Sequence, residues 1–248
     1  MSQRLLRDLP EIDLVFPSTL VLEDAVEFLR KETFDGAVNH CVRCAYFAVI
    51  IGKKHPTFAG LTLDMESVLL GCILHEAGWT QTPGLYSKDK RFEVDGANAA
   101  RHFLQNHAEA PRWDKHRIQL VWDSIALHTT QSIAIHKQSE VHLMNLGSFT
   151  DFVGPLLPGD YITVNEYKAI VKAFPRGDFM ERGKKVMCGF CRDKPETTYD
   201  NLVGDFGLLF GYDGKGEGKE EYAKVHEEHS RLMGPLFAAW DECSKYEE

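Results

Sequence analysis

One segment, DMESVLLGCILHEA at residues 64–77, constrains the fold of this chain more than any other. Its apolar residues leave almost no polar side, which is typical of a helix that is buried all round. The segment delivers two adjacent ionisable side chains, His75 and Glu76, into the interior. Because an ionised carboxylate is costly to bury alone, we expect either a neighbouring arginine or a metal ion to compensate it.

Apolar residues recur at three- and four-residue spacing along most of the chain, and the sustained alternation of half-buried strands is nearly absent. This pattern predicts an all-α protein. Prolines and glycines fall between the periodic segments, where helix breakers are expected. The predicted helices cover residues 22–32, 36–53, 64–77, 93–107, 112–128, 139–153, 163–173, 177–191, 198–210 and 219–244.

The predicted helices should form a single domain. No flexible linker divides the 248 residues, and no internal repeat indicates a stacked solenoid. We therefore expect one helical domain over 1–248, with a core of about 35–207 and a C-terminal helical extension over 208–248.

The charge and the cysteines of the chain restrict its partners and its compartment. A formal net charge of −9 repels phosphate backbones and anionic lipids, which argues against nucleic acid and membrane partners. The acidic residues Asp8, Glu11 and Asp13 interrupt the stretch where a secretory signal needs an apolar run. Six scattered cysteines in a chain of this size indicate reduced thiols. We expect a cytoplasmic protein that acts on a small molecule, with a homo-oligomer left open.

Four further polar residues are candidates for the same interior site. His40 shares a helical face with apolar neighbours, His128 ends the buried face of the segment 112–128, and Asp151 lies between apolar residues. His102 lies on a mixed helical face that either lines a pocket or meets solvent. Taken alone, each histidine is also compatible with an ordinary hydrogen-bonded core residue, and Asp151 with a hydrogen bond at a helix end.

Two C-x-x-C pairs could indicate a structural zinc site or a redox site, but both signals are weak. Cys41 and Cys44 lie inside one predicted helix, and Cys188 and Cys191 lack the strand-turn-helix context of a redox motif. The chain also has no glycine-rich phosphate loop, so nothing indicates a nucleotide cofactor.

The order of the motifs resembles a known family. A histidine is followed by an adjacent histidine–acid pair and, several helices later, by an aspartate, which is similar to the HD-domain superfamily and within it to the fungal cyanamide hydratase-like branch. The residues that carry the resemblance span roughly positions 35–207 and read NHCVRCAYF, LLGCILHEAGWT, RFEVDGANAARHFL, VWDSIALHTT, GSFTDFVG and CRDKPETTYDNLVGDFG.

The resemblance implies a single all-α domain and a metal site. His40, His75 and Asp151 match the metal ligands of the family, and Glu76 stands where the family has aspartate. The implied cofactor is one divalent transition metal, with zinc favoured over iron. Glu76 and His128 are the candidate proton donors, and His102 is a further candidate catalytic residue of the pocket.

Three functions follow as hypotheses. The first is a metal-dependent hydratase or hydrolase that attacks a small neutral substrate such as a nitrile or cyanamide through an activated water. The second is a metal-independent lyase, cyclase or isomerase in which a buried Glu76 moves protons. The third is a non-catalytic protein that keeps the scaffold, because a fold alone does not imply an activity.

Overall fold

The computed structural model describes residues 6–231 and 233–246, and the prediction of an all-α fold is confirmed. Within these ranges the chain forms helices and only two isolated β-bridges, Leu9 with Leu14 and Pro83 with Tyr86. It divides into two compact units, Met1–Met180 and Glu181–Glu248. The first unit therefore ends before the predicted core does, and the single domain over 1–248 stays a prediction.

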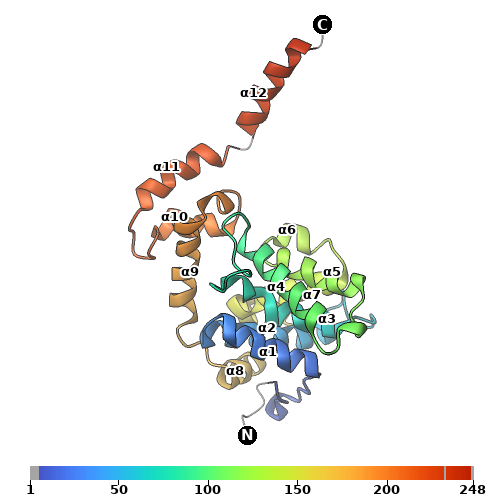
Figure 1. Cartoon of the computed structure of the whole chain (residues 1–248). Coiled ribbons are helices and arrows are strands. Elements are labelled where there is room, and N and C mark those ends of the chain that lie inside the picture. The colour runs from blue at the N-terminus through green and yellow to red at the C-terminus, as the bar shows by residue number, and fades with distance from the viewer. Residues whose placement is uncertain (1–5, 232, 247–248) are drawn as a thin grey trace. The chain divides into compact units, whose positions relative to one another are not determined.

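The first unit holds most of the helices that Figure 1 draws. All of the candidate site residues lie within its residue range. One short helix, α6, has no counterpart in the sequence prediction because four residues are too few to show a helical period. The elements are η1 Pro10–Ile12, α1 Leu20–Glu32, α2 Asp35–Lys54, α3 Met65–Leu74, η2 His75–Trp79, α4 Phe92–Asn106, η3 Ala110–Arg112, α5 Lys115–Ala126, α6 Gln131–Ala134, α7 Ser139–Val153, η4 Gly154–Leu156 and α8 Val164–Ala173.

Helix α3 is the centre of this unit, as its apolar sequence predicts. Every residue from Ser67 to Leu74 is buried, and the helix packs against α1, α2, α4, α5 and α7. Its start is capped by Asp64, whose Oδ1 accepts the backbone N–H of Ser67 at 3.2 Å. The helix ends at Leu74 rather than at 77, and the tighter 3-10 turn η2 carries His75 and Glu76.

Two close backbone approaches fix the elements that carry site residues. A Cβ atom on Gly147 of α7 would lie 2.8 Å from the carbonyl oxygen of Cys44, so α2 and α7 pack at very short range. A Cβ atom on Gly78 of η2 would lie only 1.9 Å from the carbonyl oxygen of Phe92 at the start of α4. Glycine at these positions lets the backbones touch, because any side chain would fill the contact.

The second unit contains the C-terminal helices of the chain. Helix α9, Phe179–Asp193, begins in the first unit and continues into the second. Helices α10 and α11 pack through Gly207, where a Cβ atom would lie 2.4 Å from the ring of Tyr222. The remaining elements are η5 Pro195–Thr197, α10 Leu202–Phe210, α11 Lys219–His229, α12 Met233–Cys243 and η6 Ser244–Tyr246.

The single helix predicted over 219–244 is wrong. The structure divides it into α11 and α12, with Ser230 and Arg231 outside both. Pro235 explains the division, because a proline ring clashes with the carbonyl four residues earlier, at Arg231, and has no N–H for a continuous helix. In the first turn of α12 the missing N–H has no intrahelical partner to lose.

Within the two described ranges, none of the helices is long and apolar enough to cross a bilayer.

Candidate metal and active site

Four side chains from three parts of the first unit meet in its interior. His40 comes from the second turn of α2, His75 and Glu76 from η2, and His128 from the turn after α5. The Nε2 atoms of His40 and His75 lie 3.1 Å apart, and Glu76 Oε1 lies 3.9 Å from the first and 3.7 Å from the second. Donor atoms of His75, Glu76 and His128 also lie within 4.8 Å of one another.

The three imidazoles are oriented in the same way. The Nδ1 atom of His40 lies 2.7 Å from Asp151 Oδ2, that of His75 lies 2.7 Å from the carbonyl oxygen of Cys72, and that of His128 lies 2.7 Å from the carbonyl oxygen of Ile125. Because a carbonyl or an ionised carboxylate can only accept, each Nδ1 carries the proton and donates. All three Nε2 atoms therefore keep an unprotonated lone pair, and those of His40 and His75 lie 3.1 Å apart.

The interior keeps these imidazoles neutral. Burial lowers the pKa of His40 despite the opposing hydrogen bond to Asp151. Burial lowers the pKa of His75 much further, and the neighbouring His128 and His40 add to this shift. The pKa of His128 is also lowered by burial, although the charge of Glu93 opposes the change. Neutral imidazoles with free lone pairs are the form that binds a transition metal.

Glu76 is a buried carboxylate with one oxygen left unpaired by the described residues. It is 4% exposed, and its Oε2 atom has no hydrogen-bond partner within the described part of the chain. Burial raises its pKa well above the ordinary value, and the nearby Glu93 carboxylate raises it further. Without a cation the site therefore favours a protonated Glu76, and with a bound cation it favours the ionised form.

Asp151 contacts the Nδ1 side of His40 and lies outside the closely spaced donor groups of the described residues. Its Oδ1 accepts Arg43 Nε at 2.7 Å, and its Oδ2 accepts Arg43 Nη2 and His40 Nδ1, each at 2.7 Å. These bonds hold the pKa of Asp151 far below its usual range, although burial alone would raise it. The resemblance implies that Asp151 is a metal ligand; in this structure both of its oxygens accept hydrogen bonds from Arg43 and His40, an arrangement that also suits a carboxylate that orients a histidine.

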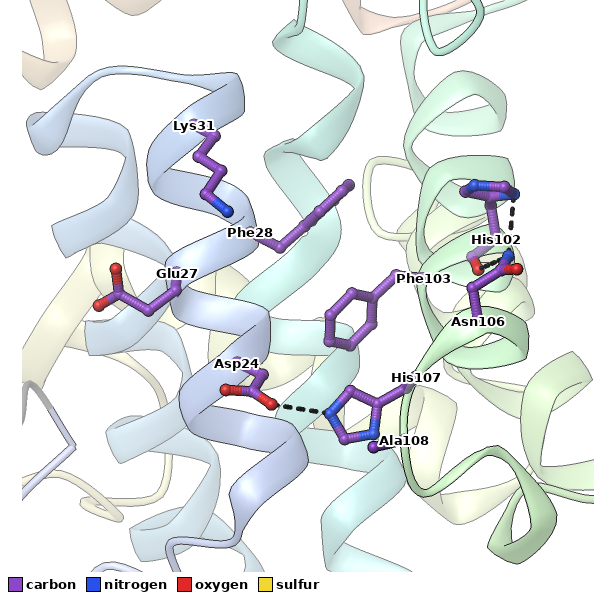
Figure 2. A pocket seen from close by; sticks show the side chains of 9 residues that line it. All are labelled: Asp24, Glu27, Phe28, Lys31, His102, Phe103, Asn106, His107 and Ala108. Atoms are coloured by element: carbon purple, nitrogen blue, oxygen red, sulfur yellow. Dashed lines mark hydrogen bonds and ion pairs between the residues drawn. The ribbon is translucent and has the colours of Figure 1, made fainter.

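His102 is not brought to this cluster. It is exposed on α4, where Asn106 Nδ2 lies 3.3 Å from its Nδ1. It lines a pocket of about 430 Å³. Figure 2 shows it on the α4 side, with Phe28 and Phe103 between α1 and α4, and Asp24 lies 2.9 Å from His107 Nε2. The helical face that makes His102 a candidate therefore opens onto the surface.

Cys44 is a neighbour that sequence reasoning did not select. Its Sγ lies 3.7 Å from both ring nitrogens of His40, and together with His75 these residues form a second group of closely spaced donor atoms. Burial raises the pKa of the Cys44 thiol well above its ordinary value, and the charge of Asp151 adds to this effect. A protonated thiol is a poor metal ligand, which favours the histidine and Glu76 donors over Cys44.

Aromatic rings close the site on the side of His40. Phe179 stacks on the His40 ring with centroids 4.3 Å apart, and Phe152 lies 5.2 Å from the same ring. Trp79 stacks on Phe179 in turn, at 5.9 Å. Phe179 and Trp79 are almost fully buried. These rings shield the donor atoms from bulk water.

A comparison with known families identifies one that matches the part of the chain holding the site. Residues 37–151 match the HD domain. The matched segment contains every residue of the cluster, and the match supports the HD-domain superfamily that the motifs resemble. HD domains are often metal-dependent hydrolases and are all-α. No curated protein matches the chain.

The residues present fit the divalent metal that an HD domain typically binds. Two nitrogens bound at about 2.1 Å to one ion lie roughly 3.0 to 3.4 Å apart, depending on the coordination geometry. The 3.1 Å between the Nε2 atoms of His40 and His75 agrees with this spacing. The unpaired Glu76 oxygen and the three oriented imidazoles provide a mixed nitrogen and oxygen donor set, which suits zinc or ferrous iron.

Proposed function

We propose that this protein is a metal-dependent hydratase or hydrolase that acts on a small neutral substrate of the nitrile or cyanamide type. One observation carries the proposal: the imidazoles of His40, His75 and His128 each donate through Nδ1 to an oxygen, and the Nε2 atoms of His40 and His75 lie 3.1 Å apart beside Glu76. This pattern is typical of histidines that hold a metal. The resemblance to the cyanamide hydratase-like branch supports the choice of reaction.

His40, His75, His128 and Glu76 would hold the metal. When bound, such an ion supplies Lewis acidity and a water whose pKa is lowered toward about 7. Asp151 and the carbonyl groups of Cys72 and Ile125 keep the rings in one tautomer. The ring of Phe179 excludes bulk water, which strengthens electrostatic interactions within the site.

Hydration of a nitrile also needs a proton for the nitrogen that gains negative charge. Water adds its oxygen to the carbon, one carbon–nitrogen π bond breaks, and its electron pair goes to nitrogen. The unpaired Glu76 Oε2 is the position in this site that can take the proton released by the added water and pass it to that nitrogen. The resulting imidic acid becomes an amide, or a urea if the substrate is cyanamide, when its hydroxyl proton moves to nitrogen.

A neutral substrate also agrees with the state of Arg43. Its guanidinium is fully buried, bonds Asp151 through Nε and Nη2, and bonds the carbonyl oxygen of Phe174 through Nη1. Phosphoryl transfer calls for cationic groups that are free to hold spread negative charge. Arg43 Nε, Nη1 and Nη2 are already bonded within the protein, so we rank phosphate hydrolysis below hydration.

The test is metal analysis of protein purified without chelator, followed by assays with cyanamide and simple nitriles. We expect about one equivalent of zinc or iron per chain and hydration that chelator abolishes and metal restores. Less than about 0.1 equivalent after reconstitution with both metals, together with no chelator-sensitive turnover, would contradict the proposal.

A second candidate function is supported by the raised pKa of Glu76, which is caused first by its burial. A protonated acid beside the neutral His75 suits metal-independent proton transfer in a lyase, cyclase or isomerase. Full activity in excess chelator, lost in Glu76→Gln, would favour this function over the first. A Glu76→Asp variant that gains metal binding absent from the natural protein would instead favour a non-catalytic or repurposed scaffold.

A further inference from the structure

Glu93 is a buried carboxylate next to the site that neither the family motifs nor the metal donor set uses. It lies in the first turn of α4 and is 1% exposed. Its Oε1 accepts the hydroxyl of Thr129 at 2.5 Å, whereas its Oε2 is buried without a hydrogen-bond partner in the part of the chain that the structure describes. A buried acceptor that lacks a donor is uncommon and needs an explanation.

The fold holds Glu93 against the candidate metal ligands from two sides. Gly78 of η2 contacts the backbone of α4 at Phe92 and Gly96, which places the turn that carries Glu76 on the turn that carries Glu93. Thr129, which bonds Glu93, directly follows His128. The Glu93 charge adds to the burial that raises the pKa of Glu76 and opposes the burial that lowers the pKa of His128, in agreement with this proximity.

Glu93 nevertheless stands outside the closely spaced donor groups. Among the described residues, those groups contain His40, Cys44 and His75, or His75, Glu76 and His128. Glu93 lies beside the candidate ligands without being one of them. Its unpaired Oε2 is therefore an acceptor available to a molecule bound next to the metal. Asp95, one turn along α4, offers a contrast, because each of its oxygens accepts a hydrogen bond from Ser87.

We propose that Glu93 Oε2 accepts an N–H bond from an amino group of the substrate, so that the site selects a molecule with –NH2 next to the reacting carbon over an alkyl nitrile. This inference rests on the proposed function for the identity of the reaction. It depends on the unused acceptor of Glu93 for the selectivity. A site built to hydrogen-bond a substrate N–H discriminates strongly against an analogue without it, because the buried acceptor is then left unpaired.

The kinetic test compares cyanamide with acetonitrile, which has a methyl group in place of the amino group. The full-length, zinc-loaded protein should prefer cyanamide in kcat/KM by about 100-fold or more. In Glu93→Gln the amide oxygen can keep the Thr129 bond while the amide nitrogen replaces Oε2, so a donor faces the substrate amine. We expect this variant to lose most of the preference by slowing cyanamide alone, and the exposed Glu27→Gln to keep it.

A binding test separates this inference from the proposed reaction. Urea and acetone have the same shape, neither is a nitrile, and only urea has N–H groups. In NMR titrations of the same zinc-loaded protein, urea should bind about 10-fold more tightly than acetone or better, and Glu93→Gln and Glu93→Leu should remove the difference. If neither nitrile is hydrated but this pattern holds, the proposed function fails and the inference about Glu93 stands.

Other outcomes overturn the inference. It fails if wild-type protein binds urea no better than acetone, or if Glu93→Gln weakens both ligands equally, as a purely structural role would. If neither Glu93 variant folds, an NMR measurement on the wild-type protein still tests the inference. Urea must then shift the carboxyl carbon resonance of Glu93, and acetone must not. A shift caused by both ligands or by neither contradicts a direct N–H bond.

Discussion

At the scale of single residues, the buried charges of the site differ in how far other residues of the protein neutralise them. Arg43 and Asp151 neutralise each other completely in the interior. Glu76 and Glu93 each keep one buried oxygen without a partner within the described ranges. The protein therefore pairs the carboxylate that orients His40 and leaves unpaired the carboxylates that face the candidate metal and substrate.

Glu76→Gln should stabilise the metal-free protein and abolish metal binding. The raised pKa of Glu76 means that its contribution to stability is present below the unfolded pKa of about 4.5 and is lost as pH rises. The glutamine has no charge to bury, so we expect a gain of about 1–3 kcal/mol at pH 8 by guanidinium denaturation. Zinc affinity should fall by more than about 100-fold. Equal or lower stability of the metal-free variant would contradict the assignment.

Asp151→Asn should destabilise the protein because it leaves the buried Arg43 cation without its counter-charge. We expect a loss of about 3–5 kcal/mol at pH 7. The pKa of Asp151 is depressed, so its stabilising effect is present above the unfolded pKa and is lost as pH falls through the folded one. The difference between variant and wild type should therefore shrink in strong acid. The exposed Glu27→Gln is the control, and it should follow the wild type throughout.

At the scale of elements, the packing of η2 on α4 decides the site. The two elements touch through backbone at Gly78 and Gly96. This contact brings Glu76 and Glu93 together although they are distant along the chain. Helix α3 supplies the support, since its buried residues hold the start of η2 in the centre of the unit.

Gly78→Ala should damage this arrangement. The added Cβ would lie 1.9 Å from the carbonyl oxygen of Phe92, which is rigid backbone, so η2 and α4 must separate. We expect a loss of at least about 2–3 kcal/mol in unfolding free energy, together with weaker zinc binding. Gly189→Ala on α9 is the matched control, because its Cβ meets only the end of Arg192 at 3.7 Å. That control should gain about 0.5–1 kcal/mol from helix propensity.

At the scale of the whole molecule, metal binding, folding and pH are linked. The cluster draws its ligands from α2, η2 and the turn after α5, so a bound ion ties together segments that separate on unfolding. An ion that binds only the folded state stabilises it in proportion to the logarithm of its concentration. The buried imidazoles add a dependence on protons.

The stability of the metal-free protein should fall as pH drops below about 6.5. The pKa values of His40, His75 and His128 are all lowered on folding, so the unfolded chain binds more protons in this window and stability rises with pH. The slope between pH 5 and 7 should be steeper in Glu76→Gln, which lacks the opposing contribution. Thermal melts over this range, with and without zinc, measure both effects. A flat profile in Glu76→Gln would contradict neutral buried histidines.

Much of the fold could be predicted from local pattern. The apolar run of α3 predicts a fully buried helix because no face of it can meet water at low cost, and the structure confirms this. The three- and four-residue spacing located the other long helices to within a few residues. The prediction failed where one residue outweighs a periodic pattern, as Pro235 does between α11 and α12.

The roles of individual residues within the site could be predicted less well from the sequence. Reading along the chain selects His40, His75, Glu76, His128 and Asp151; in the structure donor atoms of the first four lie close to one another in two overlapping groups, and Asp151 bonds His40 from the Nδ1 side. The structure does not bring His102 there, because a helical face with mixed polarity has no direction until the helix is packed. Glu93 was missed, although it lies in the RFEVDGANAARHFL motif that carries the family resemblance.

The amino-acid sequence by itself determined the helical class, the buried central helix and most of the polar residues proposed for the interior, because burial of apolar side chains follows from local periodicity. Only the tertiary structure decided which atoms face each other: Asp151 toward Arg43 and His40, the Nε2 atoms of His40 and His75 toward Glu76, and Glu93 beside Thr129. Hydrogen bonds and metal geometry depend on distances of a few tenths of an ångström between segments far apart in the chain, and no local pattern encodes such distances.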